Sequence, residues 1–157
     1  MKSILKLHVL ICVVILFAAL RSTAEADVRP GVRFGGYFDS GGAFIGGEIL
    51  ADTAWRHWYF NPNVEFVFAD QAKLATFNFD VHYDLPVRSG VYVWVGGGPA
   101  ILYRNPDNER LDSETDFAFN VLMGVGFNKG GSVTPYVQPK VILSDHSYFS
   151  LAFGIRF

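Results

Sequence analysis

Apolar residues alternate with polar or small residues along most of the chain beyond residue 26. The clearest case is the closing segment SYFSLAFGIRF, in which every second residue from Phe149 to Phe157 is large and apolar. Successive side chains point to opposite faces of a β-strand, so this pattern predicts a strand with one apolar face that continues to the last residue. Chain ends are usually polar and loosely held, and such a face therefore requires an apolar environment.

Short clusters of Gly, Asn, Asp, Ser and Pro interrupt the alternation at regular intervals. No stretch between them repeats apolar residues at helical spacing, and evenly spaced strands with Gly-rich turns are typical of a β-sandwich or a barrel. The predicted strands are residues 31–39, 43–51, 56–68, 73–85, 91–104, 117–127, 133–143 and 148–157.

The two faces of these strands differ in character. In segment 73–85, for example, Phe77 and Val81 share one face while Asn78 and His82 share the other. A soluble barrel would turn the apolar face inward around an apolar ligand. Its solvent-exposed exterior would then carry few charges. The reverse arrangement, with aromatic residues toward lipid and polar groups inside, is typical of outer-membrane strands. We therefore predict an all-β, up-and-down, antiparallel, eight-stranded transmembrane β-barrel, with a soluble periplasmic barrel that binds an apolar ligand as the alternative.

Two features limit this prediction. Segments 43–51 and 91–104 are apolar on both faces, so the pattern does not reveal which face points inward. Four prolines also lie within predicted strands, where they cannot donate a hydrogen bond to a neighbouring strand. We expect Pro62, Pro99, Pro135 and Pro139 to mark bulges or strand ends.

The first 26 residues have the pattern of a cleaved secretory signal. Lys2 and Lys6 precede the apolar run 7–20, and Ala24-Glu25-Ala26 has the small residues of a cleavage site. The run is shorter than the roughly 20 residues of a membrane-spanning helix. The predicted domains are a signal peptide over residues 1–26 and a barrel over residues 27–157.

Composition narrows the possible chemistry. The chain is only 18% charged and is 16% aromatic, whereas soluble domains carry about 25% charge. Residues 27–157 contain 10 basic and 14 acidic residues, so no basic excess indicates nucleic-acid binding. The single cysteine, Cys12, lies in the predicted signal, which leaves the mature chain without disulfides or thiol chemistry.

The chain resembles the small eight-stranded outer-membrane β-barrel proteins of Gram-negative bacteria (OmpA/OmpX-like barrels), because eight predicted strands and a terminal phenylalanine follow the predicted signal peptide. The segments VYVWVGGGPAILYR and FNVLMGVGF are similar to the central Gly-containing strands of that family. The resemblance implies export through the periplasm and a monomeric barrel in the outer membrane, among lipid and lipopolysaccharide. It also implies insertion by the barrel-assembly machinery, for which Phe153, Ile155 and Phe157 would be the C-terminal assembly signal. It does not imply one activity.

The polar faces carry charged side chains of both signs. Because side chains fill the interior of an eight-stranded barrel, opposite charges there should satisfy one another. We predict a structural network of ion pairs and hydrogen bonds in the lumen, with a proton relay or ion path as the alternative. Its predicted members are Arg33, Glu48, Glu65, Asp80, His82, Asp84, Lys140 and Arg156.

Two clusters contain residue types that catalysis or metal binding requires. Asp80, His82 and Asp84 share one strand face and could ligate a metal, although a lone inward histidine more often forms ordinary hydrogen bonds. The sequence Asp145-His146-Ser147 contains the residue types of a hydrolase, but consecutive residues in a tight turn cannot readily align for catalysis. We therefore expect a non-enzymatic structural, surface-interaction or envelope-stability role, with a lipid A-modifying enzyme as the alternative.

The longest predicted loop, residues 105–116, is acidic. Its carboxylates could bind Ca²⁺ or Mg²⁺ near lipopolysaccharide phosphates, since hard cations prefer oxygen ligands. The loop lacks the glycine of the EF-hand motif, and a solvated acidic loop is the favoured interpretation. We predict no cofactor and no metal site; the weak candidate ligands are Asp107, Glu109, Asp112, Glu114 and Asp116.

Overall fold

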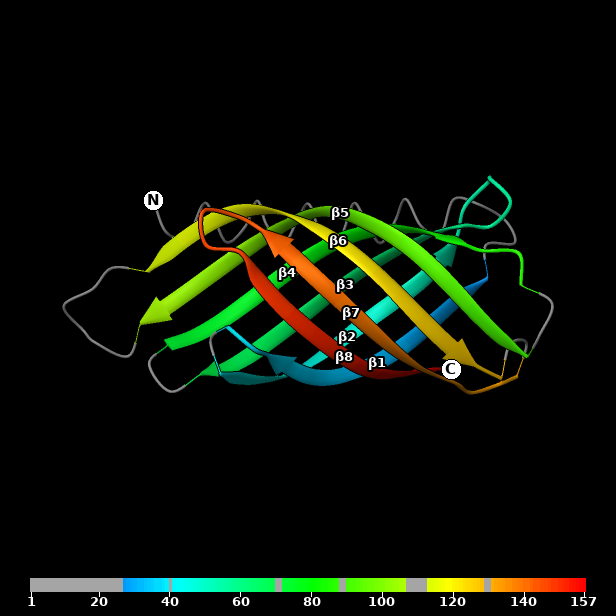
Figure 1. The fold of residues 1–157 in the computed structure, drawn as a ribbon, viewed down its shortest axis with the longest axis horizontal. Coiled ribbons are helices and arrows are strands. Elements are labelled where there is room, and N and C mark those ends of the chain that lie inside the picture. Colours follow the sequence, from blue (N-terminus) through cyan, green and yellow to red (C-terminus); the bar gives the residue numbers. More distant parts are fainter. Residues whose placement is uncertain (1–26, 40, 70–71, 88–89, 107–112, 129–130) are drawn as a thin grey trace.

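The computed structural model describes residues 27–157 except residues 40, 70–71, 88–89, 107–112 and 129–130, and the predicted signal peptide lies outside the described residues. Eight antiparallel strands form a closed barrel in sequence order, which confirms the predicted fold (Figure 1). The strands are β1 Val28–Tyr37, β2 Gly42–Asp52, β3 Trp58–Ala69, β4 Ala72–Asp84, β5 Val91–Pro106, β6 Glu114–Phe127, β7 Thr134–Leu143 and β8 Tyr148–Arg156. Within the described residues, no helix is long and apolar enough to cross a membrane.

The barrel closes where β8 pairs with β1. The register runs from Gly31 opposite Arg156 to Tyr37 opposite Ser150, and the N–H of Phe157 donates to the carbonyl oxygen of Pro30 at 2.9 Å. The start of β1 and the end of β8 therefore lie at the same end, which we call the terminal end. The opposite end, where β1 joins β2 and β3 joins β4, is called the distal end.

The outer face is apolar. Large side chains alternate outward along every strand, and none of the outward-facing strand residues with a described side chain is charged. Aromatic pairs also cross the closing seam, with the ring centroids of Phe34 and Phe153 6.0 Å apart. The strand residues that are at least half exposed include Val32, Phe34, Ile45, Phe66, Phe68, Phe117, Phe119, Val121 and Met123.

The prolines require a correction. Only Pro135, the second residue of β7, lies at a strand end as expected. Pro62, Pro99 and Pro139 lie in mid-strand, where one ladder of pairs is interrupted and then resumes in the same register, without a bulge. Beside Pro62, the side-chain amide of Asn61 donates to the carbonyl oxygen of Ile49 at 3.0 Å, which partly replaces the missing strand contact.

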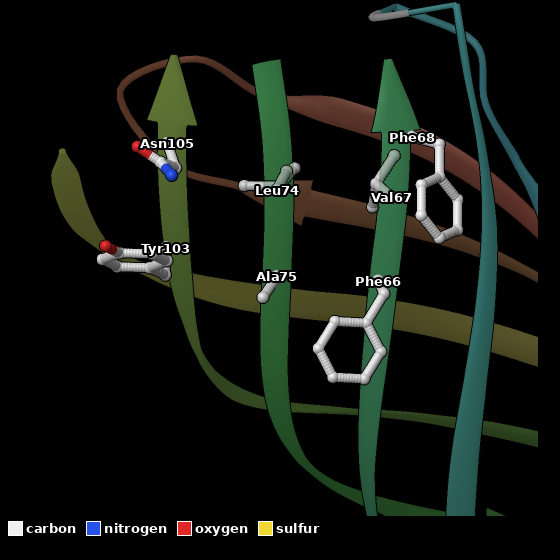
Figure 2. A pocket seen from close by; sticks show the side chains of 7 residues that line it. All are labelled: Phe66, Val67, Phe68, Leu74, Ala75, Tyr103 and Asn105. Atoms are coloured by element: carbon white, nitrogen blue, oxygen red, sulfur yellow. The ribbon is translucent and has the colours of Figure 1, made fainter. Parts of the chain in front are cut away.

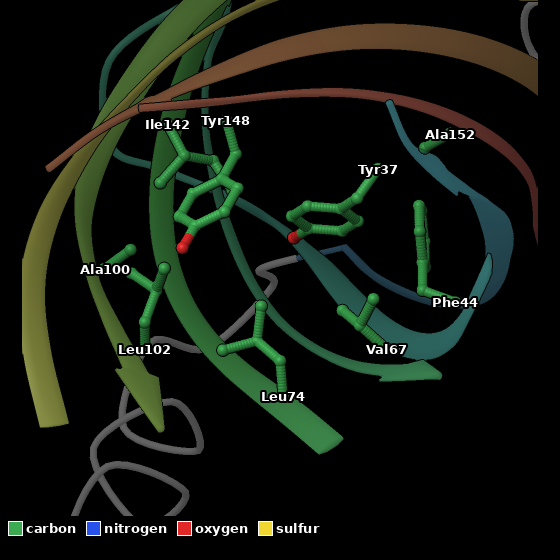
Figure 3. Packing of buried hydrophobic residues seen from close by; sticks show 9 residues of the cluster. All are labelled: Tyr37, Phe44, Val67, Leu74, Ala100, Leu102, Ile142, Tyr148 and Ala152. Atoms are coloured by element: carbon green, nitrogen blue, oxygen red, sulfur yellow. The ribbon is translucent and has the colours of Figure 1, made fainter. Parts of the chain in front are cut away.

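The interior is not polar throughout. An apolar cluster fills the distal part of the barrel, where side chains from seven strands, all except β6, point toward one another (Figure 3). The sequence pattern did not indicate this cluster, because its members alternate with equally apolar outward residues. It consists of Tyr37, Phe44, Val67, Leu74, Ala100, Leu102, Ile142, Tyr148 and Ala152.

Candidate functional site

The central part of the lumen contains a network of charged side chains, and Glu65 lies on one side of it. Lys140 Nζ lies 3.0 Å from both oxygens of the Glu65 carboxylate, and Arg33 Nη2 lies 3.1 Å from Oε1. The hydroxyls of Tyr37 and Thr76 donate to Oε2. The Glu65 carboxylate therefore has cations from β1 and β7 and neutral donors from β1 and β4.

Glu48 forms the second centre of the network. Arg156 Nε donates to Oε1 at 2.8 Å, and its Nη2 donates to Oε2 at 3.4 Å. Arg33 Nη1 donates to the same Oε2 at 3.5 Å, and Asn61 Nδ2 donates to it at 3.1 Å. Since Arg33 also lies beside Glu65, its guanidinium links the two carboxylates.

Asp80 is satisfied differently, by amides. Asn63 Nδ2 donates to one carboxylate oxygen at 2.9 Å, and Asn120 Nδ2 donates to the other at 2.7 Å. Asn78 extends this chain, because it donates to Asn63 Oδ1 at 3.0 Å and accepts from Asn120 Nδ2 at 2.8 Å. These interactions matter because an unpaired charge removed from water is strongly destabilising.

The three buried cations of this network balance its three buried carboxylates, and all six side chains are at most 5% exposed. The structure thus brings six of the eight predicted luminal residues together. They are Arg33, Glu48, Glu65, Asp80, Lys140 and Arg156.

An aromatic layer lies next to the network, toward the terminal end. The Arg156 guanidinium lies 4.3 Å from the ring centroid of Tyr136 and 5.0 Å from that of Trp94. Trp94 is fully buried, stacks on Tyr92 at 5.0 Å and donates through Nε1 to Gln138 Oε1 at 3.1 Å. This layer packs across the lumen on the terminal side of the ion pairs.

Sequence reasoning missed this layer, because segment 91–104 is apolar on both faces. A usable signal lies in the partner strand. Gly124 and Gly126 occupy inward positions of β6 opposite Trp94 and Tyr92, and a Cβ atom at either glycine would lie within 2.3 Å of the facing ring. Small residues opposite large ones therefore identify the inward face of β5.

His82 and Asp84 lie in this terminal part of the lumen. The His82 ring is fully buried between Tyr59 and Trp94, with centroids 5.5 and 5.4 Å away. Its Nε2 lies 3.6 Å from Asp84 Oδ1, beyond a hydrogen bond. Asp80 is held by amides instead, and the described residues contain no group of three or more His, Cys, Asp or Glu side chains that could hold a metal ion.

The structure describes only some of the remaining candidates. Asp107, Glu109 and Asp112 are outside the described residues, whereas Glu114 and Asp116 lie at the start of β6. Asp145, His146 and Ser147 are all exposed on the β7–β8 turn, where Ser144 donates its hydroxyl to the carbonyl oxygen of His146.

The residues of the predicted assembly signal point away from the barrel. Phe153, Ile155 and Phe157 are 45%, 36% and 56% exposed, respectively.

Comparisons with known proteins bear on the fold. No protein-family model matches the sequence, and no curated protein matches it. The N-terminal β-barrel domain of Pseudomonas aeruginosa OprF is similar in structure, with a TM-score of 0.69 and 13% identity over 85% of this chain and 98% of that domain. Neisserial surface protein A has a TM-score of 0.67 at 14% identity over 85% of this chain and 98% of its own.

A third structure, the attachment invasion locus protein Ail of Yersinia pestis, has a TM-score of 0.57 at 10% identity, over 85% of this chain and 100% of its own. At such low identity, these similarities bear on architecture and not on activity. The chain therefore has the fold of the small eight-stranded outer-membrane β-barrels.

Proposed function

We propose that this protein is an integral, monomeric barrel of a bacterial outer membrane, with a closed lumen and a non-enzymatic structural, surface-interaction or envelope-stability role. The observation that carries the proposal is the contrast between the two faces of the sheet. The described outward side chains of the strands are uncharged, while three cations and four carboxylates are buried inside. Lipid is the solvent that matches such an exterior.

A soluble barrel fits this contrast poorly. In water, the outward aromatic and aliphatic residues would form one continuous apolar surface around the molecule, far beyond the roughly 300–600 Å² of the largest patch on a typical soluble monomer. The apolar rows also point away from the lumen, which is opposite to the arrangement that a carrier of an apolar ligand requires.

The aromatic residues near the barrel ends support a transmembrane orientation. Trp58 and Tyr83 lie on the outer face at the terminal end, with ring centroids 5.3 Å apart, and Tyr103 lies on the outer face toward the distal end. Aromatic rings of this kind are enriched at both membrane–water boundaries. In the proposed orientation the terminal end faces the periplasm and the distal end faces the exterior. Residues 1–26 direct export, and the barrel-assembly machinery recognises the last strand.

The packing of the lumen supports a barrel that neither conducts nor catalyses. The apolar cluster, the ion pairs and the aromatic layer follow one another along the axis, as expected for an interior filled by side chains. Of the two histidines that a lipid A-modifying enzyme could use, His82 is fully buried and His146 lies in an exposed turn.

Fractionation tests the proposal most directly. The protein is expressed with its own leader and recovered from the outer-membrane fraction, where the folded barrel should require detergent for extraction and migrate faster on gels before boiling than after it. Recovery from the periplasm without detergent would overturn the proposal. In planar bilayers the purified barrel should give no steady single-channel conductance, and a stable conductance would show that the lumen is open.

A further inference from the structure

The hairpin formed by β5 and β6 extends beyond the neighbouring strand β7 at the distal end. β6 pairs with β5 from Glu114 onward, whereas its pairing with β7 begins only at Phe119, opposite Leu143. β5, in contrast, is paired with β4 as far as Pro106. In Figure 1 the start of β6 accordingly lies beyond the turn that joins β7 to β8. Residues 114–118 therefore form a strand edge that has β5 on one side and no described strand on the other.

The free side of this edge presents backbone groups to which another strand can bind. Successive residues of an antiparallel strand direct their N–H and C=O groups alternately to the two neighbouring strands. Alternate residues of the edge therefore point these groups away from β5, where no described residue forms a backbone hydrogen bond with them. Unpaired backbone groups are unfavourable in hydrocarbon, so in the proposed orientation the edge lies among headgroups or in water. A partner can reach it there, since exposed sheet edges accept an added strand.

The outer face of the hairpin is aromatic beside this edge. Phe117 is 80% exposed, which is the largest exposed fraction among the large apolar side chains that the structure describes. Tyr103 on β5 is 42% exposed, and its ring points away from Ala75 on β4, toward the side of β5 on which β6 pairs (Figure 2). The hairpin thus offers apolar contact area next to the free backbone groups.

The inner face of the edge is acidic. Glu114 and Asp116 lie two positions apart, on the face opposite to Phe117. Arg104 is the cross-strand partner of Glu114, but its guanidinium donates to the hydroxyl of Tyr148 instead. Among the described residues, neither carboxylate has an ion pair. Two carboxylates without a cation make this face complementary to cationic side chains.

We propose that the edge at residues 114–118 binds an extended peptide segment of a partner protein in which cationic and apolar residues alternate. When such a segment is added beside β6, its cationic side chains lie next to Glu114 and Asp116 and its apolar side chains lie next to Phe117. Side chains directly opposite one another on neighbouring strands are about 4.5–5.5 Å apart, which is close enough for both kinds of contact. The inference gives the proposed surface-interaction role a site and a class of partner, and it rests on the proposed orientation for the side from which the partner arrives.

The same carboxylates disfavour a second copy of this chain as the occupant. Antiparallel pairing of two identical edges around Asp116 would place this carboxylate opposite its own copy. Parallel pairing in register would do so for Glu114 as well. Like charges directly opposite in a sheet are destabilising, and charged residues commonly protect strand edges against self-association. The edge therefore favours a cationic strand over a copy of itself.

The test titrates short synthetic peptides against the folded barrel in detergent micelles. One peptide alternates Lys and Val, and a second alternates Glu and Val. A third has the Lys–Val sequence with N-methyl groups on all backbone amides, which removes the donors and keeps the charge. NMR amide exchange locates the bound peptide, since added hydrogen bonds should slow exchange at alternate residues of 114–118. The double variant Glu114→Gln/Asp116→Asn tests the charges, and Asp52→Asn, a partly exposed carboxylate at the terminal end, is the matched control.

We expect only the unmodified Lys–Val peptide to bind. The double variant should bind it about tenfold more weakly at low salt, where surface charges are least screened, and Asp52→Asn should bind it as the unmodified protein does. Equal binding of the N-methylated peptide would overturn the added strand, and equal binding by the double variant would overturn the role of the carboxylates.

Two further outcomes would overturn the proposal, namely no binding of the Lys–Val peptide and slowed amide exchange elsewhere than at residues 114–118. If the double variant fails to fold, the N-methylated peptide and the amide exchange of the unmodified protein still decide. A negative result refutes the peptide site alone, because fractionation tests the membrane location separately.

Discussion

Lys140 and Glu65 are 75 positions apart in the sequence, yet Lys140 Nζ lies 3.0 Å from both oxygens of the Glu65 carboxylate inside the barrel. Both side chains are fully buried. Their contact joins β7 to β3 across the lumen, so the interaction connects strands that share no backbone hydrogen bonds.

We expect Lys140→Met to lower the free energy of unfolding by about 3–5 kcal/mol, because it leaves an excess buried negative charge. Urea-induced unfolding of the barrel in lipid vesicles would measure this change. Arg29→Met is the matched control: its ion pairs with Asp27 and Asp52 are partly exposed at the terminal end, and their loss should cost less than about 1 kcal/mol. A double-mutant cycle with Glu65→Gln should give a coupling energy of about 0.5–3 kcal/mol. Independent effects would contradict the ion pair.

Gly124→Ala should destabilise the barrel by about 1–3 kcal/mol, because the new Cβ would lie 2.1 Å from Cζ2 of Trp94 in a packed lumen. Gly90→Ala makes the same change at a position with no atom within 4 Å, and its effect should stay within about 0.5 kcal/mol. The fluorescence emission of Trp94 should also shift in the Gly124→Ala variant. Replacing Trp55 and Trp58 by Phe allows the emission of Trp94 to be measured alone. Equal stability of the two alanine variants would show that Trp94 does not occupy this position.

Val121→Arg tests the membrane directly. Val121 is 50% exposed on the outer face near the middle of β6, and an arginine there should cost about 2–4 kcal/mol in a bilayer. Val133→Arg places the same side chain in the β6–β7 connection, outside the strands, where we expect little change. Stability in lipid vesicles measures both. If the two variants were equally stable, the outer face would not be in contact with lipid.

Deletion of Phe157 should reduce the amount of barrel in the outer membrane more than it reduces stability in vitro. The side chain is 56% exposed, so its removal costs little internal packing, although the N–H of Phe157 also donates to Pro30. Outer-membrane levels by immunoblot and refolding of the purified chain into vesicles separate the two effects. Normal assembly of the deletion would remove the assembly-signal interpretation.

We expect His82→Ala and His146→Ala, separately and together, to leave the lipid A composition of the host unchanged. The first histidine is enclosed by Tyr59 and Trp94, and the second lies in an exposed turn. Mass spectrometry of lipid A extracted from these strains measures its composition, and a strain without the gene serves as the comparison. A species that appears with the protein and disappears in either variant would identify an enzyme.

The sequence predicted those parts of the barrel in which the two faces differ chemically. Along β4, for example, Phe77 and Val81 alternate with Asn78 and Asp80, and the structure places the first pair outside and the second inside. Along β5 the alternation is between apolar residues, so the inward position of Trp94 depends on the space left by Gly124 across the ladder. The inward face of β5 can therefore be predicted only when β5 and β6 are considered together, and not from the pattern of either strand alone.

The candidate site was predictable in part for the same reason. The charged residues on polar strand faces show which side chains point into the lumen, but they do not show which of these side chains form ion pairs with one another. The pairing of Arg33 with both carboxylates follows from the register: Arg33 and Glu65 lie on either side of Gly46, and Glu48 is two positions from Gly46 on the same face of β2. At Pro62 no bulge is needed, because the side-chain amide of Asn61 donates to the carbonyl oxygen of Ile49, which lies opposite the proline.

No bulge interrupts the ladders beside the mid-strand prolines, and inward and outward positions alternate there without a break. This regularity makes the molecule sensitive to length in a specific way. A one-residue insertion in the middle of a strand would move every later side chain of that strand to the opposite face, sending charges into lipid and phenylalanines into the lumen. A two-residue insertion would keep every side chain on its own face, but it would shift the later residues of the strand by two positions against their partners. Within strands, even-numbered insertions should therefore be less damaging than odd-numbered ones, and odd-numbered changes should be confined to the turns.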